Sequence, residues 1–117
     1  MGWTVLAHPG FAPEMRRDLP DDARFELQAH VRLLSIHGPT LTRPHADTLK
    51  GSRHANMKEL RFRTERGVWR VAYAFDPNRR AILLCAADKQ GLRGPKEKRF
   101  YARLIAKADA RFDDYAP

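Results

Sequence analysis

Three consecutive β-strands are predicted by residues 57–89, MKELRFRTERGVWRVAYAFDPNRRAILLCAADK, and the rest of the chain is arranged around them. Polar and apolar residues alternate over Met57–Thr64 and, after a short segment that contains a glycine, over Val68–Phe75. A glycine between two alternating runs is typical of a β-hairpin. A turn-forming Asp-Pro-Asn segment then leads into Ala81–Ala87, which is almost wholly apolar, as expected of a strand buried on both faces.

The two faces of this hairpin differ in chemical character. Side chains alternate between the faces of a strand, so a two-residue turn at Arg66-Gly67 separates an apolar face from a charged one. The charged face then holds Glu59, Arg61, Arg63, Arg70, Ala72 and Ala74, with Arg63 opposite Arg70. Three arginines beside two small alanines predict an open anion-binding surface, because guanidinium groups bind phosphate in planar, bidentate geometry. The alternative is a polar face that contacts only solvent.

The composition describes a basic globular chain. Lys and Arg outnumber Asp and Glu by 22 to 14, a formal net charge of +8, which favours a polyanionic partner, most often nucleic acid, or else an acidic protein. A length of 117 residues predicts one domain, residues 1–117. No run of about 18 apolar residues predicts a membrane span, and no leader segment predicts secretion. We therefore expect a cytoplasmic protein without membrane contact.

The segments that flank the three strands predict one more strand and three helices. Trp3–His8 reads as a short opening strand. Apolar residues spaced four apart predict a helix from Phe11 to before Pro20, and a second helix is predicted from Asp21 or Asp22 to the break at Gly38-Pro39. The first third of the chain therefore predicts a helical hairpin laid on a sheet. A last helix is predicted from Pro95, with an apolar stripe that runs to Phe112.

Further basic residues lie outside the strands. Pro39–Asn56 shows no periodicity and predicts an irregular surface segment, where functional residues are common. This segment carries Lys50, Arg53 and His54. A second basic group follows the last strand and is positioned to border the arginine-bearing face; it consists of Lys89, Arg93, Lys96 and Arg99.

Several types of site have no support in the sequence. The five histidines are scattered and have no cysteine partner, so neither a metal site nor a cofactor is predicted. The GxxxxGK[ST], GxGxxG and GxSxG motifs are absent, which removes the basis for nucleotide-fold and acyl-transfer activities. Cys85 lies in the most apolar strand and is predicted to be a buried core residue, not a nucleophile or part of a disulfide.

The chain resembles the phage-derived HigB-like branch of the RelE/ParE toxin superfamily, from Trp3 to Phe112. The segments that carry the resemblance are Asn56–Arg61 (NMKELR), Trp69–Asp76 (WRVAYAFD), Asp88-Lys89 with Gly91, and Lys98–Tyr101 (KRFY) with Ala108-Asp109. The Gly38-Pro39 break and Leu49-Lys50-Gly51 belong to the same pattern.

This resemblance implies a RelE-like α+β fold: a small antiparallel sheet with an N-terminal helical hairpin and a C-terminal helix. It also implies the toxin of a type II toxin–antitoxin pair, with a helix-turn-helix antitoxin as its partner. RelE- and HigB-type relatives are ribosome-dependent endoribonucleases, so the resemblance favours an mRNA interferase that acts with the ribosome on mRNA. Two alternatives are a ParE-like toxin that acts on DNA gyrase and a non-catalytic basic RNA-binding protein.

The resemblance also assigns roles at an RNA phosphodiester, where the 2′-oxygen attacks phosphorus and the 5′-oxygen leaves. Arg61 and Arg70 match family positions and are expected to stabilise the charged phosphorane. Lys89 matches a basic residue that assists the leaving group or holds the scissile phosphate. Together with Tyr101, where relatives place an aromatic residue, the residues expected to bind RNA are Lys50, Arg53, Arg63, Arg93, Lys96 and Arg99. The helical spacing of Tyr101 favours a core position instead.

Two acidic residues are candidates for the general base that proton transfer requires. Glu59 stands where RelE has a lysine and serves either as a general base or as an ion-pair partner of the arginines, and we favour the ion pair. Asp47 lies in a segment where some relatives carry an acidic catalytic residue and is a second candidate base. No histidine occurs in the C-terminal third, where several relatives use one.

Overall fold

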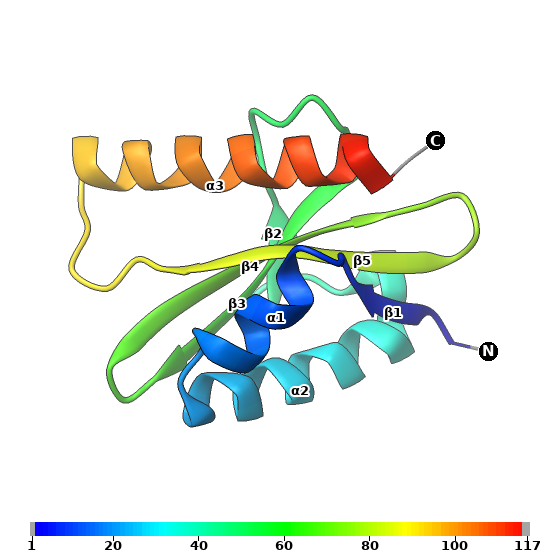
Figure 1. Ribbon diagram of the computed structural model, residues 1–117, viewed down its shortest axis with the longest axis horizontal. Helices are drawn as coiled ribbons and strands as arrows, with labels where there is room; N and C mark the ends of the chain where they lie inside the picture. The colour runs from blue at the N-terminus through cyan, green and yellow to red at the C-terminus, as the bar shows by residue number, and fades with distance from the viewer. Residues whose placement is uncertain (1, 116–117) are drawn as a thin grey trace.

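The computed structural model describes residues 2–115 and contains a five-stranded sheet with helices on both faces (Figure 1). The strand order is β1-β5-β4-β3-β2, and all neighbours are antiparallel except β1 and β5. The elements are β1 (Thr4–Ala7), α1 (Phe11–Arg17), α2 (Asp21–His37), the 3-10 turn η1 (Gly38–Thr40), β2 (Ala46–Thr48), β3 (Met57–Thr64), β4 (Gly67–Phe75), β5 (Arg80–Asp88) and α3 (Pro95–Tyr115). The α+β class, the helical hairpin and the C-terminal helix are as predicted.

The β3–β4 hairpin has a different register from the predicted one. Thr64 pairs with Gly67, so Glu65 and Arg66 form the turn and Arg61, not Arg63, lies opposite Arg70. The predicted register was wrong by two residues, which preserves the assignment of side chains to faces. Gly67 is the first residue of β4, and the Trp69 indole lies so close to it that a β-carbon would have no room.

One face of the sheet packs against α1 and α2. Its hairpin residues Leu60, Phe62, Val71 and Tyr73 are at most 6% exposed and belong to one apolar cluster with residues of α2. This is the apolar face expected from the alternation of the two strands. Figure 1 shows both N-terminal helices on this side of the sheet.

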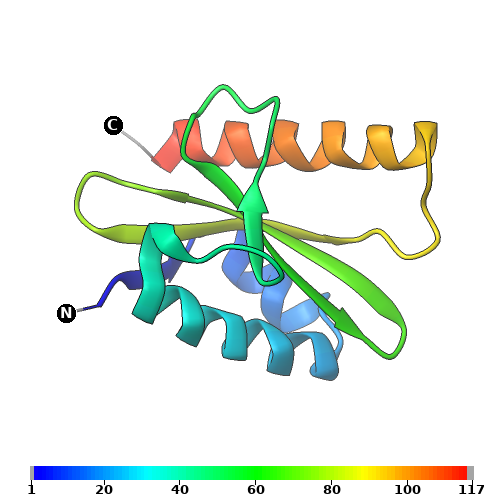
Figure 2. The ribbon, with the colours of Figure 1, turned by 180° about the vertical axis from the view of Figure 1, so that it is seen from behind.

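The opposite face is covered by α3, and here the prediction of an open alanine-lined surface was wrong. Ala72 and Ala74 are fully buried, packed in a second apolar cluster with Phe100 and Leu104 of α3. Figure 2 shows α3 running along this side of the sheet, with α2 on the opposite side. The small side chains make room for the helix, so only the charged end of this face remains available to a ligand.

β5 is buried on both faces, as its apolar sequence predicted. Ala81 and Leu83 contact the first cluster, and Ile82 and Leu84 contact the second. A bulge in β5, opposite Ala72 and Tyr73 of β4, leaves Leu84 without a partner in the ladder. Cys85 is buried beside it, and burial raises the pKa of its thiol to about 12, so the thiol is unreactive at neutral pH.

The segment Pro39–Asn56 is more ordered than its sequence predicted. It contains η1 and the strand β2, whose three residues pair with Lys58, Glu59 and Leu60 of β3. A strand this short shows no periodicity, and its pairing with β3 supplies the order that the local sequence lacks. No helix within residues 2–115 is both long and apolar enough to cross a membrane.

Candidate functional site

An open groove of about 1010 Å³ lies between α3 and the part of the chain that includes β2 and the start of β3. It brings together residues that are far apart in the sequence and that were expected to act on RNA. Those that line it are Asp47, Lys50, Arg53, Glu59, Arg61, Lys89 and Tyr101. Arg43, Glu97 and Lys98 also line the groove and were not predicted.

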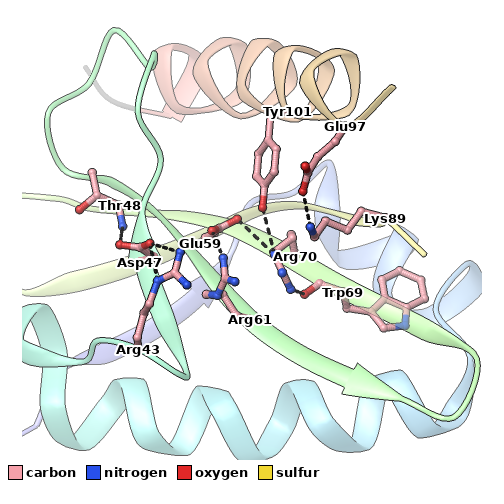
Figure 3. A network of polar contacts seen from close by, with 10 residues as sticks. All are labelled: Arg43, Asp47, Thr48, Glu59, Arg61, Trp69, Arg70, Lys89, Glu97 and Tyr101. Carbon is pink, nitrogen blue, oxygen red and sulfur yellow. Dashed lines mark hydrogen bonds and ion pairs between the residues drawn. The ribbon is translucent and has the colours of Figure 1, made fainter. Parts of the chain in front are cut away.

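Glu59 stands at the centre of a polar network on the sheet (Figure 3). Its Oε2 accepts a hydrogen bond of 2.7 Å from Arg61 Nη1, and its Oε1 lies 3.7 Å from Arg70 Nε. Glu59 is only 3% exposed, and Arg61 and Arg70 are directly opposite each other on β3 and β4. The carboxylate therefore offsets the repulsion between the paired arginines. Glu59 thus forms the ion pair that we favoured for it, and a part in proton transfer stays a prediction.

Tyr101 connects α3 to this network. Its hydroxyl accepts a hydrogen bond of 3.1 Å from Arg70 Nε, while Arg70 Nη1 donates to the carbonyl of Trp69 at 3.0 Å. Burial is the main cause that raises the pKa of Tyr101, so the phenol is neutral at physiological pH. Tyr101 packs against the apolar cluster under α3 with its ring and reaches the groove with its hydroxyl.

Arg70 is placed differently from the expectation. Its side chain is 7% exposed, and it is not among the groove-lining residues. Arg70 donates a hydrogen bond to Tyr101 and lies close to the Glu59 carboxylate. This position favours a role in orienting those two groove residues over direct contact with a ligand.

Asp47 on β2 is a partly exposed carboxylate at the other side of the groove. It accepts hydrogen bonds from the Thr48 backbone N–H at 2.8 Å and from Arg43 Nε at 2.9 Å. These two bonds, the backbone one first, lower its pKa below the usual range. A lower pKa makes Asp47 a weaker base. Arg43 lies in the aperiodic segment, and only its positive charge in the sequence hinted at a role.

Lys89 meets the first turn of α3. It forms an ion pair with Glu97, and the hydrogen bond from Lys89 is the largest cause that lowers the pKa of Glu97. An acidic residue shortly after Pro95 is a recognised preference at helix N-termini, so the sequence did contain a signal for Glu97. Nothing in the sequence separated Lys98 from the other basic residues of α3.

Other predicted residues do not gather at the groove. Those that lie exposed and outside its lining are Arg63, Arg93, Lys96 and Arg99. Arg53 does line the groove, but its guanidinium is paired with Asp113 of α3. Within residues 2–115 no histidine lines the groove, and no group of three His, Cys, Asp or Glu side chains is arranged to hold a metal ion.

Comparisons with known proteins place the chain in a family. The family model described as phage-derived protein Gp49-like (DUF891) matches residues 15–113. "Putative toxin HigB3" of Mycobacterium tuberculosis is 40% identical over 80% of this chain and 77% of its own length. "Putative toxin HigB2" of the same organism is 41% identical over 74% of this chain, which spans only 42% of that longer protein.

The fold has a counterpart among solved structures. A double-arginine mutant of E. coli toxin RelE in the free state superposes with a TM-score of 0.66 over 95% of this chain and 98% of that chain. The two sequences are 12% identical, so this match concerns the fold alone. The resemblance to phage-derived, HigB-like proteins is confirmed by the family model and the two relatives, and the RelE-like fold is confirmed by the structural match.

Proposed function

We propose that this chain, which belongs to the phage-derived Gp49-like family, is the toxin of a toxin–antitoxin pair and cleaves mRNA. The two relatives that are 41% and 40% identical to this chain carry toxin names, which supports the first part. The second part is supported by the groove, where Arg61 of β3 and Lys89, the residue that follows β5, lie beside a carboxylate and a phenol. That convergence is the single observation on which the proposal of RNA cleavage rests.

The proposed chemistry is attack of the RNA 2′-oxygen on the adjacent phosphorus with departure of the 5′-oxygen. Arg61 stabilises the negative charge that develops on the phosphorane, because a guanidinium can bind two of its oxygens at once. Asp47, the more exposed of the two candidate carboxylates, accepts the proton of the 2′-hydroxyl, and Lys89 donates a proton to the leaving 5′-oxygen. Arg70 and Glu59 position the groove residues from beneath.

The proposal includes the partners that such a toxin requires. They are the ribosome, which presents mRNA, and an antitoxin of the helix-turn-helix type that neutralises the toxin in the cytoplasm. The cations outside the groove, Arg63, Arg93, Lys96 and Arg99, would add sequence-independent contacts to RNA phosphates.

Expression without an antitoxin tests the proposal. Wild-type protein is expected to arrest growth and to produce mRNA cuts in phase with codons, as mapped from transcript 5′ ends. Arg61→Ala should reduce cleavage by about a hundredfold or more, as is typical when one preorganised charge-stabilising group is lost. Arg63→Ala is the comparison on the same strand face. Arg63 lies outside the groove, so its loss should weaken RNA binding slightly and leave the cleavage step itself unchanged.

The outcomes separate the alternatives. If Arg61→Ala cuts mRNA as well as the wild type, the assigned site is wrong. If mRNA stays intact while DNA damage is induced, a gyrase-directed toxin replaces the ribonuclease. Absence of any growth effect would leave a basic RNA-binding protein as the better description.

A further inference from the structure

The loop between β2 and β3 forms one wall of the groove, and α3 forms the opposite wall. Figure 2 shows this loop rising beside the C-terminal half of α3. Lys50 and Gly51 of the loop line the groove, and Gly51 has a φ of +100°, a conformation that glycine adopts readily. A β-carbon on Gly51 would lie 3.8 Å from Ile105 of α3, so the loop backbone passes close to the helix.

A buried carboxylate of α3 organises this loop. Asp109 is 4% exposed, and it accepts hydrogen bonds from Ser52 Oγ at 2.5 Å and from the Arg53 backbone N–H at 3.1 Å. Ser52 Oγ in turn accepts a hydrogen bond of 2.9 Å from the His54 backbone N–H. One carboxylate therefore fixes three consecutive residues of the loop, and burial makes those partners necessary for it.

A second carboxylate one helical turn further on supports the same loop from outside. Asp113 is paired with the guanidinium of Arg53, and it accepts a hydrogen bond of 2.7 Å from His54 Nε2. The His54 ring also packs edge-on against Phe112, with 4.9 Å between the ring centroids. Four side-chain and backbone donors of the loop thus meet two acidic residues spaced i, i+4 on one helix face.

The cations of the groove differ in whether a carboxylate already holds them. The paired ones are Arg43 with Asp47, Arg53 with Asp113, Arg61 with Glu59 and Lys89 with Glu97. Within the described part of the chain, Lys50 and Lys98 line the groove without an ion-pair partner. Either lysine can bind a phosphate without breaking an existing ion pair. Lys98 is held by α3 itself, whereas Lys50 depends on the loop.

We propose that Asp109 is a positioning residue, which fastens the β2–β3 loop to α3 so that Lys50 is held at the groove wall to bind a phosphate of the RNA strand. This inference rests on the proposed function. Holding the lysine in place before binding reduces the conformational entropy that is lost when RNA binds. Asp109 itself touches no substrate in this proposal and acts only through Lys50.

A double-mutant cycle tests this coupling. The variants are Asp109→Asn, Lys50→Ala, Lys98→Ala and the double variants of Asp109→Asn with each lysine change. The measurement is the affinity for a short single-stranded RNA oligonucleotide with 2′-O-methyl groups, which the enzyme cannot cleave, followed by fluorescence anisotropy. We expect Asp109→Asn to weaken binding about three- to tenfold, with little further loss when Lys50 is already alanine. With Lys98→Ala the two losses should multiply.

Two controls separate positioning from general damage to the fold. Asp114→Asn removes the same charge from a neighbouring, exposed residue that does not contact the loop and should bind RNA like the wild type. Ser52→Ala breaks the same contact from the loop side and should weaken RNA binding as Asp109→Asn does. It keeps the inference testable if Asp109→Asn folds poorly. In Asp109→Asn and in Ser52→Ala, trypsin should cleave the folded protein after Lys50 and Arg53 faster than it cleaves the wild type.

Three results would overturn the inference. One is multiplicative loss when Asp109→Asn is combined with Lys50→Ala, and another is unchanged RNA affinity in a variant whose loop has become sensitive to trypsin. In either case wild-type binding remains, and the proposed function stands. If wild-type protein does not bind the oligonucleotide at all, the inference fails, whereas the proposed function is still decided by the mapping of mRNA cuts in cells.

Discussion

At the scale of single residues, Glu59 is the side chain on which the hairpin arginines depend. It is almost fully buried, and one of its carboxylate oxygens faces Arg61 while the other faces Arg70. Removal of one member of such a buried group leaves the remaining charges without compensation, which is far more costly than loss of an exposed ion pair.

Glu59→Ala is therefore expected to lower the free energy of unfolding by about 3–5 kcal/mol, because Arg70 would remain buried without its carboxylate. Urea denaturation of the purified protein measures this change. Glu65→Ala serves as the control, since Glu65 is exposed in the hairpin turn and its replacement should change stability by less than about 0.5 kcal/mol. Equal stability of both variants would contradict the role of Glu59.

Strand alternation was enough to predict that Glu59 and the hairpin arginines share a face, because side-chain direction along a strand depends only on parity. The residues that complete the site came from elsewhere in the chain. Asp109 contacts residues 56 or more positions away, and Asp47 lies beside Glu59 because β2 pairs with β3. No local pattern encodes such contacts, so the sequence could not predict them.

At the scale of secondary-structure elements, α3 decides how much of the charged face a ligand can reach. Its apolar stripe was predicted from helical spacing, but which face of the sheet it covers was not. The spacing of apolar residues defines a buried side of a helix without naming its partner. Small side chains on a strand are compatible either with an open surface or with a helix packed closely above them. The fully buried alanines beneath α3 are the second case.

Ala72→Leu tests the packing of α3 on the sheet. Because Ala72 is fully buried between β4 and α3, the larger side chain should overpack this interface and lower stability by about 1–3 kcal/mol. The expected readout is a lower midpoint in chemical denaturation. Ala110→Leu, at an exposed position of the same helix, should leave the midpoint nearly unchanged. A tolerated Ala72→Leu would mean that α3 is not firmly seated.

α1 and α3 are joined by an ion pair beyond the edge of the sheet. Arg111 donates to both carboxylate oxygens of Glu14, at 2.9 and 2.6 Å, and to the carbonyl of Leu84 at 2.7 Å. That carbonyl belongs to the residue left unpaired by the β-bulge, so Arg111 satisfies an acceptor that the ladder cannot.

This ion pair predicts a pH dependence of stability. The hydrogen bond from Arg111 is the main cause that lowers the pKa of Glu14 from its usual 4.5 to about 2. The contribution of Glu14 is therefore complete above pH 4.5 and is lost as the pH falls towards 2. In urea denaturation at a series of pH values, the advantage of the wild type over Glu14→Gln should shrink across this interval. A constant difference between the two proteins would contradict the assignment.

At the scale of the whole molecule, the net charge of +8 is distributed unevenly. The groove combines its cations with carboxylates, whereas the outer side of α3 and the preceding loop carry exposed cations such as Arg93, Lys96 and Arg99. Charge of this kind contributes affinity without sequence preference, through the release of counterions from the nucleic acid.

RNA binding should therefore weaken steeply as salt is raised. If Arg99 contacts one phosphate, Arg99→Ala should reduce the slope of log affinity against log salt concentration by about 0.7. Titrations of an uncleavable single-stranded RNA over a range of salt concentrations measure this slope. Arg32→Ala removes an exposed cation from α2, on the other side of the sheet, and should leave the slope unchanged. A flat titration for the wild type would contradict electrostatic binding.

The paired cations of the groove have a consequence for the size of ligand that the protein can select. A free mononucleotide can contact one unpaired lysine, but to reach Arg61 it would have to separate the ion pair with Glu59, so we expect it to compete poorly. A polymer engages the unpaired lysines and the outer cations at the same time, and each further phosphate offsets the cost of separating the first pair. Carboxylates that neutralise the groove at rest would in this way make the protein discriminate by chain length.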